Sequence, residues 1–261
     1  MVHREDPNGV LIITQPAHAW ISGQMARLWG NEIFGDFTPR PEVELAAELH
    51  DLGFLKWEEE PTLNEGTGLP HTFLSLPVAE HLEIWERGIY ATTGYGRYPA
   101  LLVSMHYTWL AQKHPHYENP QAAMLTQDFL DTQAAYQSFA FASLRRDPHF
   151  AAAATEEAFT RNRRLVSLWD WLSLLLCMGK REAEVIREVP IAQGLGELVL
   201  RPKADNPWKY TLAPWPFRSA SVKLVCEAKL LEKKFQTTHA MQMGIKNAQI
   251  VPLQFELTAE R

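Results

Sequence analysis

The spacing of apolar residues changes its period once along the chain, and this change constrains the fold more than any other feature. From Gln15 to Gly179, apolar side chains mostly recur at the intervals of amphipathic helices. After residue 186 they occur in short alternating or Val- and Leu-rich runs separated by Pro, Gly and Asn, which is typical of strands. The sequence therefore predicts a mainly α protein with a small β-rich C-terminal extension.

Local signals predict the boundaries of these elements. Residues that cap helix starts, prolines in first turns and glycines at helix ends indicate six helices. The expected helices run over Gln15–Trp29, Pro41–Leu52, the segment from Ser75 to Gly88, Tyr98–Gln112, Pro120–Arg146, and Pro148–Met178 with Gly179 as its C-cap. The expected strands of a small antiparallel sheet run over Glu197–Lys203, Lys209–Ala213, Ser221–Leu231 and Gln249–Thr258.

The charged residues divide the chain at the same place. Residues 1–186 hold 24 acidic and 14 basic side chains, whereas residues 187–261 hold 7 acidic and 11 basic ones. We therefore predict a helical domain over 1–186 and a β-rich extension over 187–261 packed against it. Because the chain carries a net charge of −6, no nucleic-acid polymer is expected as its partner.

Membrane proteins and secreted disulfide-rich proteins are also excluded by the sequence. The longest apolar stretch, Leu165–Met178, is interrupted by polar residues and is too short to span the ~30 Å of a bilayer core. Acidic residues near Met1 argue against an export signal, and Cys177 and Cys226 are isolated from one another. No P-loop, nucleophile elbow or dinucleotide fingerprint is present. The expected location is the cytoplasm.

The remaining chemistry lies in the ten histidines and their acidic neighbours. The adjacent pair His50-Asp51 ends a predicted helix, where both side chains can reach one cation or two neighbouring cations. Asp170 lies between Trp169 and Trp171 in the most apolar helix, where a carboxylate is costly unless it is paired or bound to metal. This pattern predicts a metal site.

The order of these residues resembles the HD-domain superfamily, helical metal-dependent phosphohydrolases named after their His-Asp pair. The resemblance covers roughly residues 15–179, and three stretches, Ala47–Gly53, Leu102–His106 and Leu168–Ser173, also resemble an uncharacterised bacterial family within it. It implies an HD-type helical bundle and one or two divalent transition metal ions, of Fe, Mn, Zn, Ni or Co. The residues that would hold the first ion are His18, His50, Asp51 and Asp170.

Further residues complete the site that the resemblance implies. His81 and His106 resemble the ligands of a second cation in the binuclear subset, with Asp51 bridging the two ions and also counted as catalytic. The lysine of several relatives is absent at its usual spacing, and Lys56 is the first lysine available after the pair. Arg163 lies seven residues before Asp170, about 10.5 Å along one helix face, which suits binding of a distal phosphate.

Simpler interpretations stay open for several of these residues. His81 can be an exposed histidine, His106 a hydrogen-bonded core histidine, and Arg163 a surface ion-pair residue. His114 and His116 fall in a polar loop and are expected at the surface.

The predicted function is a metal-dependent hydrolase of the HD type that acts on a small phosphorylated or nucleotide-like substrate. One alternative is a di-iron oxygenase with the same six ligands, and another is a non-catalytic metal-binding sensor or structural protein. The expected partner is a small molecule rather than a membrane, and a homodimer is left open.

Overall fold

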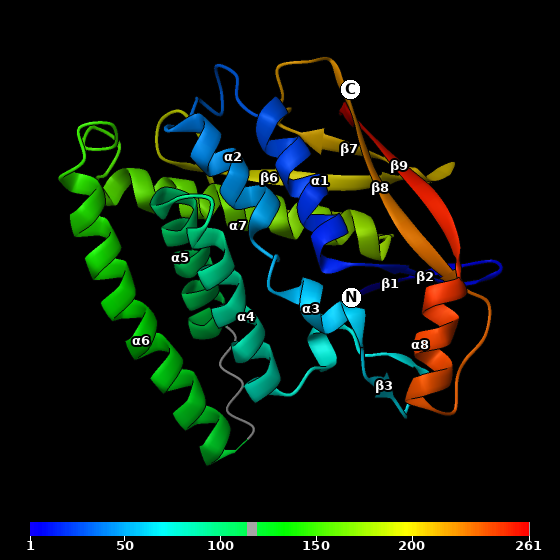
Figure 1. Ribbon diagram of the computed structural model, residues 1–261. Helices are drawn as coiled ribbons and strands as arrows, with labels where there is room; N and C mark the ends of the chain where they lie inside the picture. Colours follow the sequence, from blue (N-terminus) through cyan, green and yellow to red (C-terminus); the bar gives the residue numbers. More distant parts are fainter. Residues whose placement is uncertain (114–118, 261) are drawn as a thin grey trace.

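The computed structural model describes residues 1–113 and 119–260, so His114 and His116 lie outside the described residues. Helices occupy one side of the molecule and most strands the other (Figure 1). The helices are α1 (Gln15–Leu28), α2 (Arg40–Leu49), α3 (Phe54–Glu59), α4 (Val78–Thr93), α5 (Arg97–Lys113), α6 (Pro120–Arg145), α7 (Glu156–Met178) and α8 (Thr238–Asn247). The strands are β1 (Val2–Asp6), β2 (Gly9–Ile13), β3 (Leu63–Asn64), β4 (Leu69–Pro70), β5 (Glu184–Pro190), β6 (Leu195–Lys203), β7 (Asn206–Ala213), β8 (Ser221–Leu231) and β9 (Gln249–Ala259).

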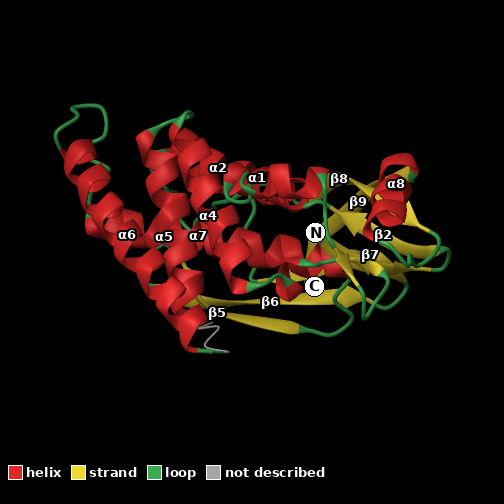
Figure 2. Cartoon of the chain, turned by 60° about the horizontal axis from the view of Figure 1, so that its bottom comes forward, coloured by secondary structure: helices red, strands yellow, loops and turns green. Residues whose placement is uncertain are grey.

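Seven strands form one curled sheet in the order β1-β2-β8-β9-β7-β6-β5. Neighbouring strands are antiparallel, except that β7 and β9 run parallel. Figure 2 shows these strands along one side of the molecule and continuing beneath α7. The prediction of a mainly α, HD-type bundle with a small antiparallel extension is therefore wrong, and the protein is not all-alpha.

Two strands of the sheet come from the very beginning of the sequence. β1 and β2 form a hairpin, and β2 pairs with β8 through Val10 and Leu231. Pro7 and Asn8 form the turn between the two strands, and Gly9 begins β2 opposite Asp6. Asp, Pro and Gly at the first, second and fourth positions are typical of a type I turn. A Cβ atom on Gly9 would lie 2.2 Å from the Leu231 carbonyl oxygen, so the close approach of β8 requires glycine here. The prediction overlooked this hairpin signal.

The helix that carries Asp170 has well-defined ends. The Thr155 side chain caps the first turn of α7 by accepting a hydrogen bond from the Ala158 amide, so the helix begins later than the predicted Pro148. Gly179 has the left-handed conformation of a C-cap, with φ of 70°, as predicted.

The change from helices to strands occurs close to the predicted domain boundary at residue 186. The last helix before it ends at Met178, and β5 begins at Glu184. The pairing of β2 with β8 nevertheless joins residues from both sides of that boundary in one sheet. The division into two domains stays a prediction.

Packing among four helices determines which chain segments meet in the interior. Helix α1 contacts α2, α7 and strand β8, while α5 contacts α2 and α7 as well as α4 and α6. Residues from α1, α5, α7 and the C-terminal end of α2 can therefore share one buried volume. Among the helices of the described residues, none combines the length and apolar composition needed to cross a bilayer.

Candidate metal centre

Five side chains from these four segments converge at one buried point, and none of the five residues is more than 8% exposed. His18 Nε2 lies 2.8 Å from Asp51 Oδ2 and 3.8 Å from Asp170 Oδ1. His50 Nε2 lies 3.3 Å from Asp170 Oδ1 and 3.8 Å from Asp51 Oδ2. His106 Nε2 lies 3.4 Å from Asp170 Oδ2. The structure thus brings together five of the six ligands predicted from the sequence.

These separations match the spacing of ligands around a cation. Zn²⁺ binds imidazole nitrogen and carboxylate oxygen at about 2.0–2.2 Å, which places neighbouring ligands about 2.8–3.6 Å apart in octahedral or tetrahedral geometry. The atoms of His18, His50 and Asp51 lie within 4.8 Å of one another, and so do those of His50, His106 and Asp170. Because the two groups share His50, the five side chains form one continuous set of candidate ligands.

The histidine rings are oriented by hydrogen bonds on their outer nitrogens. His50 Nδ1 lies 2.8 Å from the Ala47 carbonyl oxygen, which can only accept a hydrogen bond. Ser167 Oγ donates to the Arg163 carbonyl, so it accepts a hydrogen bond from His106 Nδ1, 2.9 Å away. Nδ1 of each ring therefore carries a proton, and Nε2 is the inward nitrogen that can bind a metal ion once its own proton is absent.

The inward nitrogens of two rings lack hydrogen-bond partners. Within residues 1–113 and 119–260, neither His50 Nε2 nor His106 Nε2 makes a hydrogen bond, although both are fully buried. Buried polar atoms are rarely left in this state, since the loss of hydration costs about 1–3 kcal/mol for each group. These two atoms point to a ligand between the imidazoles and Asp170, and a metal cation fits the donor set.

The side chains of three residues hold the Asp51 carboxylate, namely His18, Gln15 and Tyr107. Gln15 Nε2 donates to Oδ2 at 3.0 Å, and the Tyr107 hydroxyl donates to Oδ1 at 3.0 Å. Tyr107 also donates to the His50 carbonyl and stacks on Trp85, with ring centroids 4.8 Å apart. The position of Asp51 is thus set by α1 and α5 rather than by its own helix end alone.

The charges of the five residues are strongly coupled. Burial lowers the pKa of His50, but the Asp51 and Asp170 carboxylates outweigh burial and raise that pKa to about 9. Burial raises the pKa of Asp51 to about 7, while burial and the charge of His50 lower the pKa of His18 to about 3. The pKa of Asp170 is held far below its usual range because His50 and His106 outweigh its burial. The carboxylates therefore attract positive charge, which a divalent cation can supply.

His81 lies near this centre but in neither group of potential ligands. It is half-buried on α4, where its ring contacts Trp85 and Phe54 with centroids 4.5 and 5.8 Å away. Trp85 in turn stacks on Tyr107. The role of His81 as a ligand of a second cation stays a prediction.

The two predicted cationic catalytic residues have different surroundings. Lys56 is exposed on α3, and within the described chain no contact links it to the ligands. Arg163 is half-buried on α7, with its guanidinium 5.0 Å from the centroid of the Trp109 ring. Burial lowers the pKa of His106, and the nearby charge of Arg163 lowers it further. Arg163 is therefore within electrostatic reach of the centre.

Sequence analysis did not identify the residues that orient the ligands. Gln15, Ser167 and Ser173 each lie three residues from His18 or Asp170 in α1 or α7. Ser173 Oγ lies 3.5 Å from His18 Nδ1. Residues three apart share a helix face, so polar residues at this spacing from a buried ligand are the signal that could have found them.

We expect Ser167→Ala to weaken metal binding by about 10–100-fold, because the His106 ring loses the partner that fixes its tautomer. Competition with a chromophoric chelator measures this affinity. Ser138→Ala is the matched control, since Ser138 also donates to the carbonyl four residues earlier but is exposed on α6. Equal affinities in the two variants would contradict the orienting role of Ser167.

Comparison with family models gives a match over residues 1–233 to a model described as "Protein of unknown function (DUF3891)". No curated protein and no solved structure matches the chain.

Proposed function

The chain belongs to the DUF3891 family, and because that family is described as one of unknown function, we propose a function from the buried centre itself. The proposed function is that of a metal-dependent hydrolase of the HD type, acting on a small phosphorylated or nucleotide-like substrate. The observation that carries it is the convergence of three imidazole nitrogens and two carboxylates, in which His50 Nε2 and His106 Nε2 face Asp170 but make no hydrogen bond among the described residues. This donor set suits Fe, Mn, Zn, Ni or Co.

All five ligand residues would bind the ion. His18, His50 and His106 would supply neutral nitrogens, and Asp51 and Asp170 would supply the negative charge. A bound divalent ion polarises a phosphoryl oxygen and lowers the pKa of a water molecule, which are the two requirements of phosphoester hydrolysis. The Asp170 side chain, 11% exposed, and the Asp51 side chain, 7% exposed, are the most accessible of the five, so substrate would approach from the carboxylate side.

Arg163 would bind the anionic part of the substrate. Its guanidinium packs over Trp109, and the ammonium of Lys113 lies 4.7 Å from the centroid of the same ring. This arrangement places two positive charges at one aromatic side chain. A planar guanidinium binds phosphate through paired hydrogen bonds, so Arg163 is better suited to this role than the exposed Lys56.

The number of bound ions separates this proposal from the di-iron alternative. We expect elemental analysis of the purified protein to find one ion per chain, and His81→Ala to leave that ratio unchanged. This follows because both groups of potential ligands contain His50, whose Nε2 can bind only one ion, and neither group includes His81. Two ions per chain, falling to one in His81→Ala, would instead support the binuclear site predicted from the sequence.

Hydrolysis of p-nitrophenyl phosphate and bis(p-nitrophenyl) phosphate by protein loaded with Mn²⁺, Fe²⁺ or Zn²⁺ tests the activity. Loaded protein that hydrolyses neither ester would favour the sensor or structural alternative, and oxygen consumption by the iron form would favour the oxygenase.

We expect Arg163→Gln to raise KM for the better ester by about 10–150-fold, since one charge-assisted contact to phosphate contributes about 1.5–3 kcal/mol. Metal content should not change. The control is Arg164→Gln, because the neighbouring Arg164 forms an ion pair with Glu188 on the surface. If both variants keep the wild-type KM, Arg163 does not bind substrate.

The proposal also includes a cytoplasmic location, which cell fractionation would test. A small phosphorylated molecule remains the expected partner. Measurement of the protein's mass in solution would show whether it forms a homodimer.

A further inference from the structure

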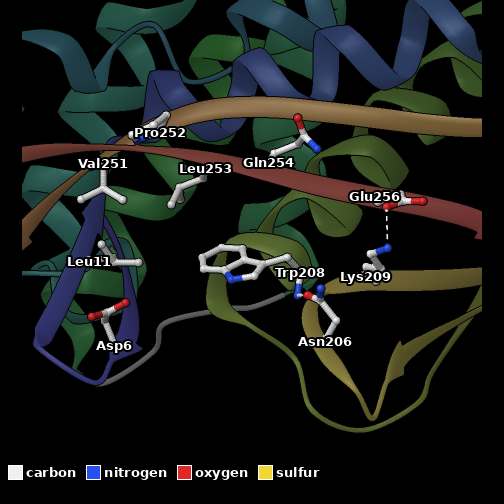
Figure 3. Close-up of a pocket in the computed structure, with 10 residues that line it drawn as sticks. All are labelled: Asp6, Leu11, Asn206, Trp208, Lys209, Val251, Pro252, Leu253, Gln254 and Glu256. Atoms are coloured by element: carbon white, nitrogen blue, oxygen red, sulfur yellow. Dashed lines mark hydrogen bonds and ion pairs between the residues drawn. The ribbon is translucent and has the colours of Figure 1, made fainter.

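A pocket of about 410 Å³ lies on the strand side of the molecule, and none of its lining residues belongs to the metal centre. Figure 3 shows the Trp208 indole between Asp6, Leu11 and Val251 on one side and Lys209 and Glu256 on the other. The volume is in the range of small-molecule sites, ~300–1,000 Å³. The walls come from β1, β2, β7 and β9, strands that are distant in the sequence.

The Arg4 side chain packs against the Trp208 indole. The Arg4 guanidinium lies 3.8 Å from the ring centroid and donates hydrogen bonds to the Leu176 and Pro207 carbonyls at 2.6 and 2.7 Å. Arg4 is 6% exposed and does not line the pocket. The half-buried indole also contacts Phe255, with ring centroids 5.5 Å apart, and the part of the indole that lines the pocket is a flat, apolar platform.

Polar groups surround this platform with both donors and acceptors available. Asp6 Oδ1 accepts from the Asn8 amide, and Asn206 Oδ1 accepts from the Trp208 amide. The second oxygen of Asp6 and the amide nitrogen of Asn206 make no hydrogen bond to the described part of the chain, and neither does the exposed side chain of Gln254. A ligand that can both accept and donate would satisfy all three groups.

The charges around the pocket nearly balance. Lys209 and Glu256 form an ion pair of 3.0 Å, the charges of Lys203 and Lys223 also act on Glu256, and Asp6 adds a carboxylate. This balance favours a ligand without net charge. A cationic ligand is disfavoured on the platform because Arg4 already occupies the other face of Trp208.

We propose that this pocket binds a neutral saccharide, with the apolar C–H face of a pyranose ring against Trp208. The hydroxyl groups of such a ring donate and accept, so they complement the free oxygen of Asp6 and the free amide hydrogens of Asn206. The site is independent of the metal centre and of the hydrolase activity proposed for it.

Saturation-transfer NMR on the full-length chain tests the proposal with defined probes. We expect transfer to the ring C–H protons of methyl α-glucopyranoside or methyl β-galactopyranoside, and none to glucose 6-phosphate, choline or adenosine. Trp208→Ala should lower saccharide affinity about tenfold or more, because the aromatic platform is lost. Trp20→Ala is the matched control, since Trp20 is 41% exposed and also lies beneath an arginine, Arg27.

A second variant keeps the test valid if Trp208→Ala is destabilised by the loss of its contact with Arg4. Asp6→Asn retains the oxygen that accepts from Asn8 and turns the other acceptor into a donor. We expect it to weaken saccharide binding severalfold at unchanged melting temperature. Absence of saccharide binding, stronger binding of adenosine, choline or glucose 6-phosphate, or equal affinities in wild type and both variants would overturn the proposal.

Discussion

Asp170→Asn is expected to lose the bound metal ion, with an affinity more than about a hundredfold below that of the wild type. The loss of partners outside the ligand sphere alone costs about 10–100-fold in other metal sites, and here a charged ligand atom is removed. Asp170 has the largest effect because it links His50 to His106 through its two oxygens, at 3.3 and 3.4 Å. Hydrolytic activity should fall with the metal content.

Thermal melting with and without chelator provides an independent measurement. Metal at a hundred times its Kd stabilises the wild type by about 2.7 kcal/mol, which corresponds to roughly 5–10 °C for a chain of this size. Chelator should therefore lower the wild-type melting temperature by that amount and leave Asp170→Asn nearly unchanged. Asp131→Asn, at an exposed position on α6, should behave as the wild type does. Equal shifts in all three proteins would show that Asp170 is not a ligand.

Asp51→Ala is expected to destabilise the metal-free protein by about 3–5 kcal/mol, as the removal of one partner from a buried charged pair does. The substitution leaves the Gln15 amide and the His18 ring without this acceptor in the interior, and the Tyr107 hydroxyl keeps only the His50 carbonyl. The midpoint of urea unfolding should fall accordingly, and metal binding should be lost.

Asp36→Ala is the control for this destabilisation. Asp36 also forms ion pairs with two arginines, Arg40 and Arg218, but its side chain is 64% exposed. Exposed ion pairs contribute about 0–1 kcal/mol to the free energy of unfolding. Asp51→Asn keeps one acceptor oxygen and should lie between the wild type and the alanine variant. If Asp51→Ala is no less stable than Asp36→Ala, the buried network does not depend on this carboxylate.

The helices and the candidate ligands were largely predictable because their signals are local. Thr14 and Thr155 accept hydrogen bonds at the starts of α1 and α7, and Gly179 ends α7 in the left-handed conformation. A carboxylate between two tryptophans indicated a paired or metal-bound Asp170 from composition alone. The structure shows that His18, His50, Asp51, His106 and Asp170 lie together, while their binding of metal stays a prediction.

The extent of the sheet was not predictable from the same reasoning. The β1–β2 hairpin has a clear turn signal at Pro7 and Asn8, but its pairing with β8 joins Val10 to Leu231. β7 likewise pairs in parallel with β9, although β8 and α8 lie between these two strands in the sequence. Alternation in a strand indicates that one face is buried, and it leaves the neighbouring strand undetermined.

The sequence by itself determined that most of the helices exist and which side-chain types are available to hold a cation, because capping and helical periodicity act over a few residues. Only the tertiary structure decided that His106 joins the ligands of Asp170, that Gln15 and Tyr107 fix Asp51, and that a hairpin from the start of the chain completes the sheet. Contacts between residues far apart in the sequence depend on how the packed layers share one core. No local pattern carries that information, since the same alternation or helix face can be buried against many partners.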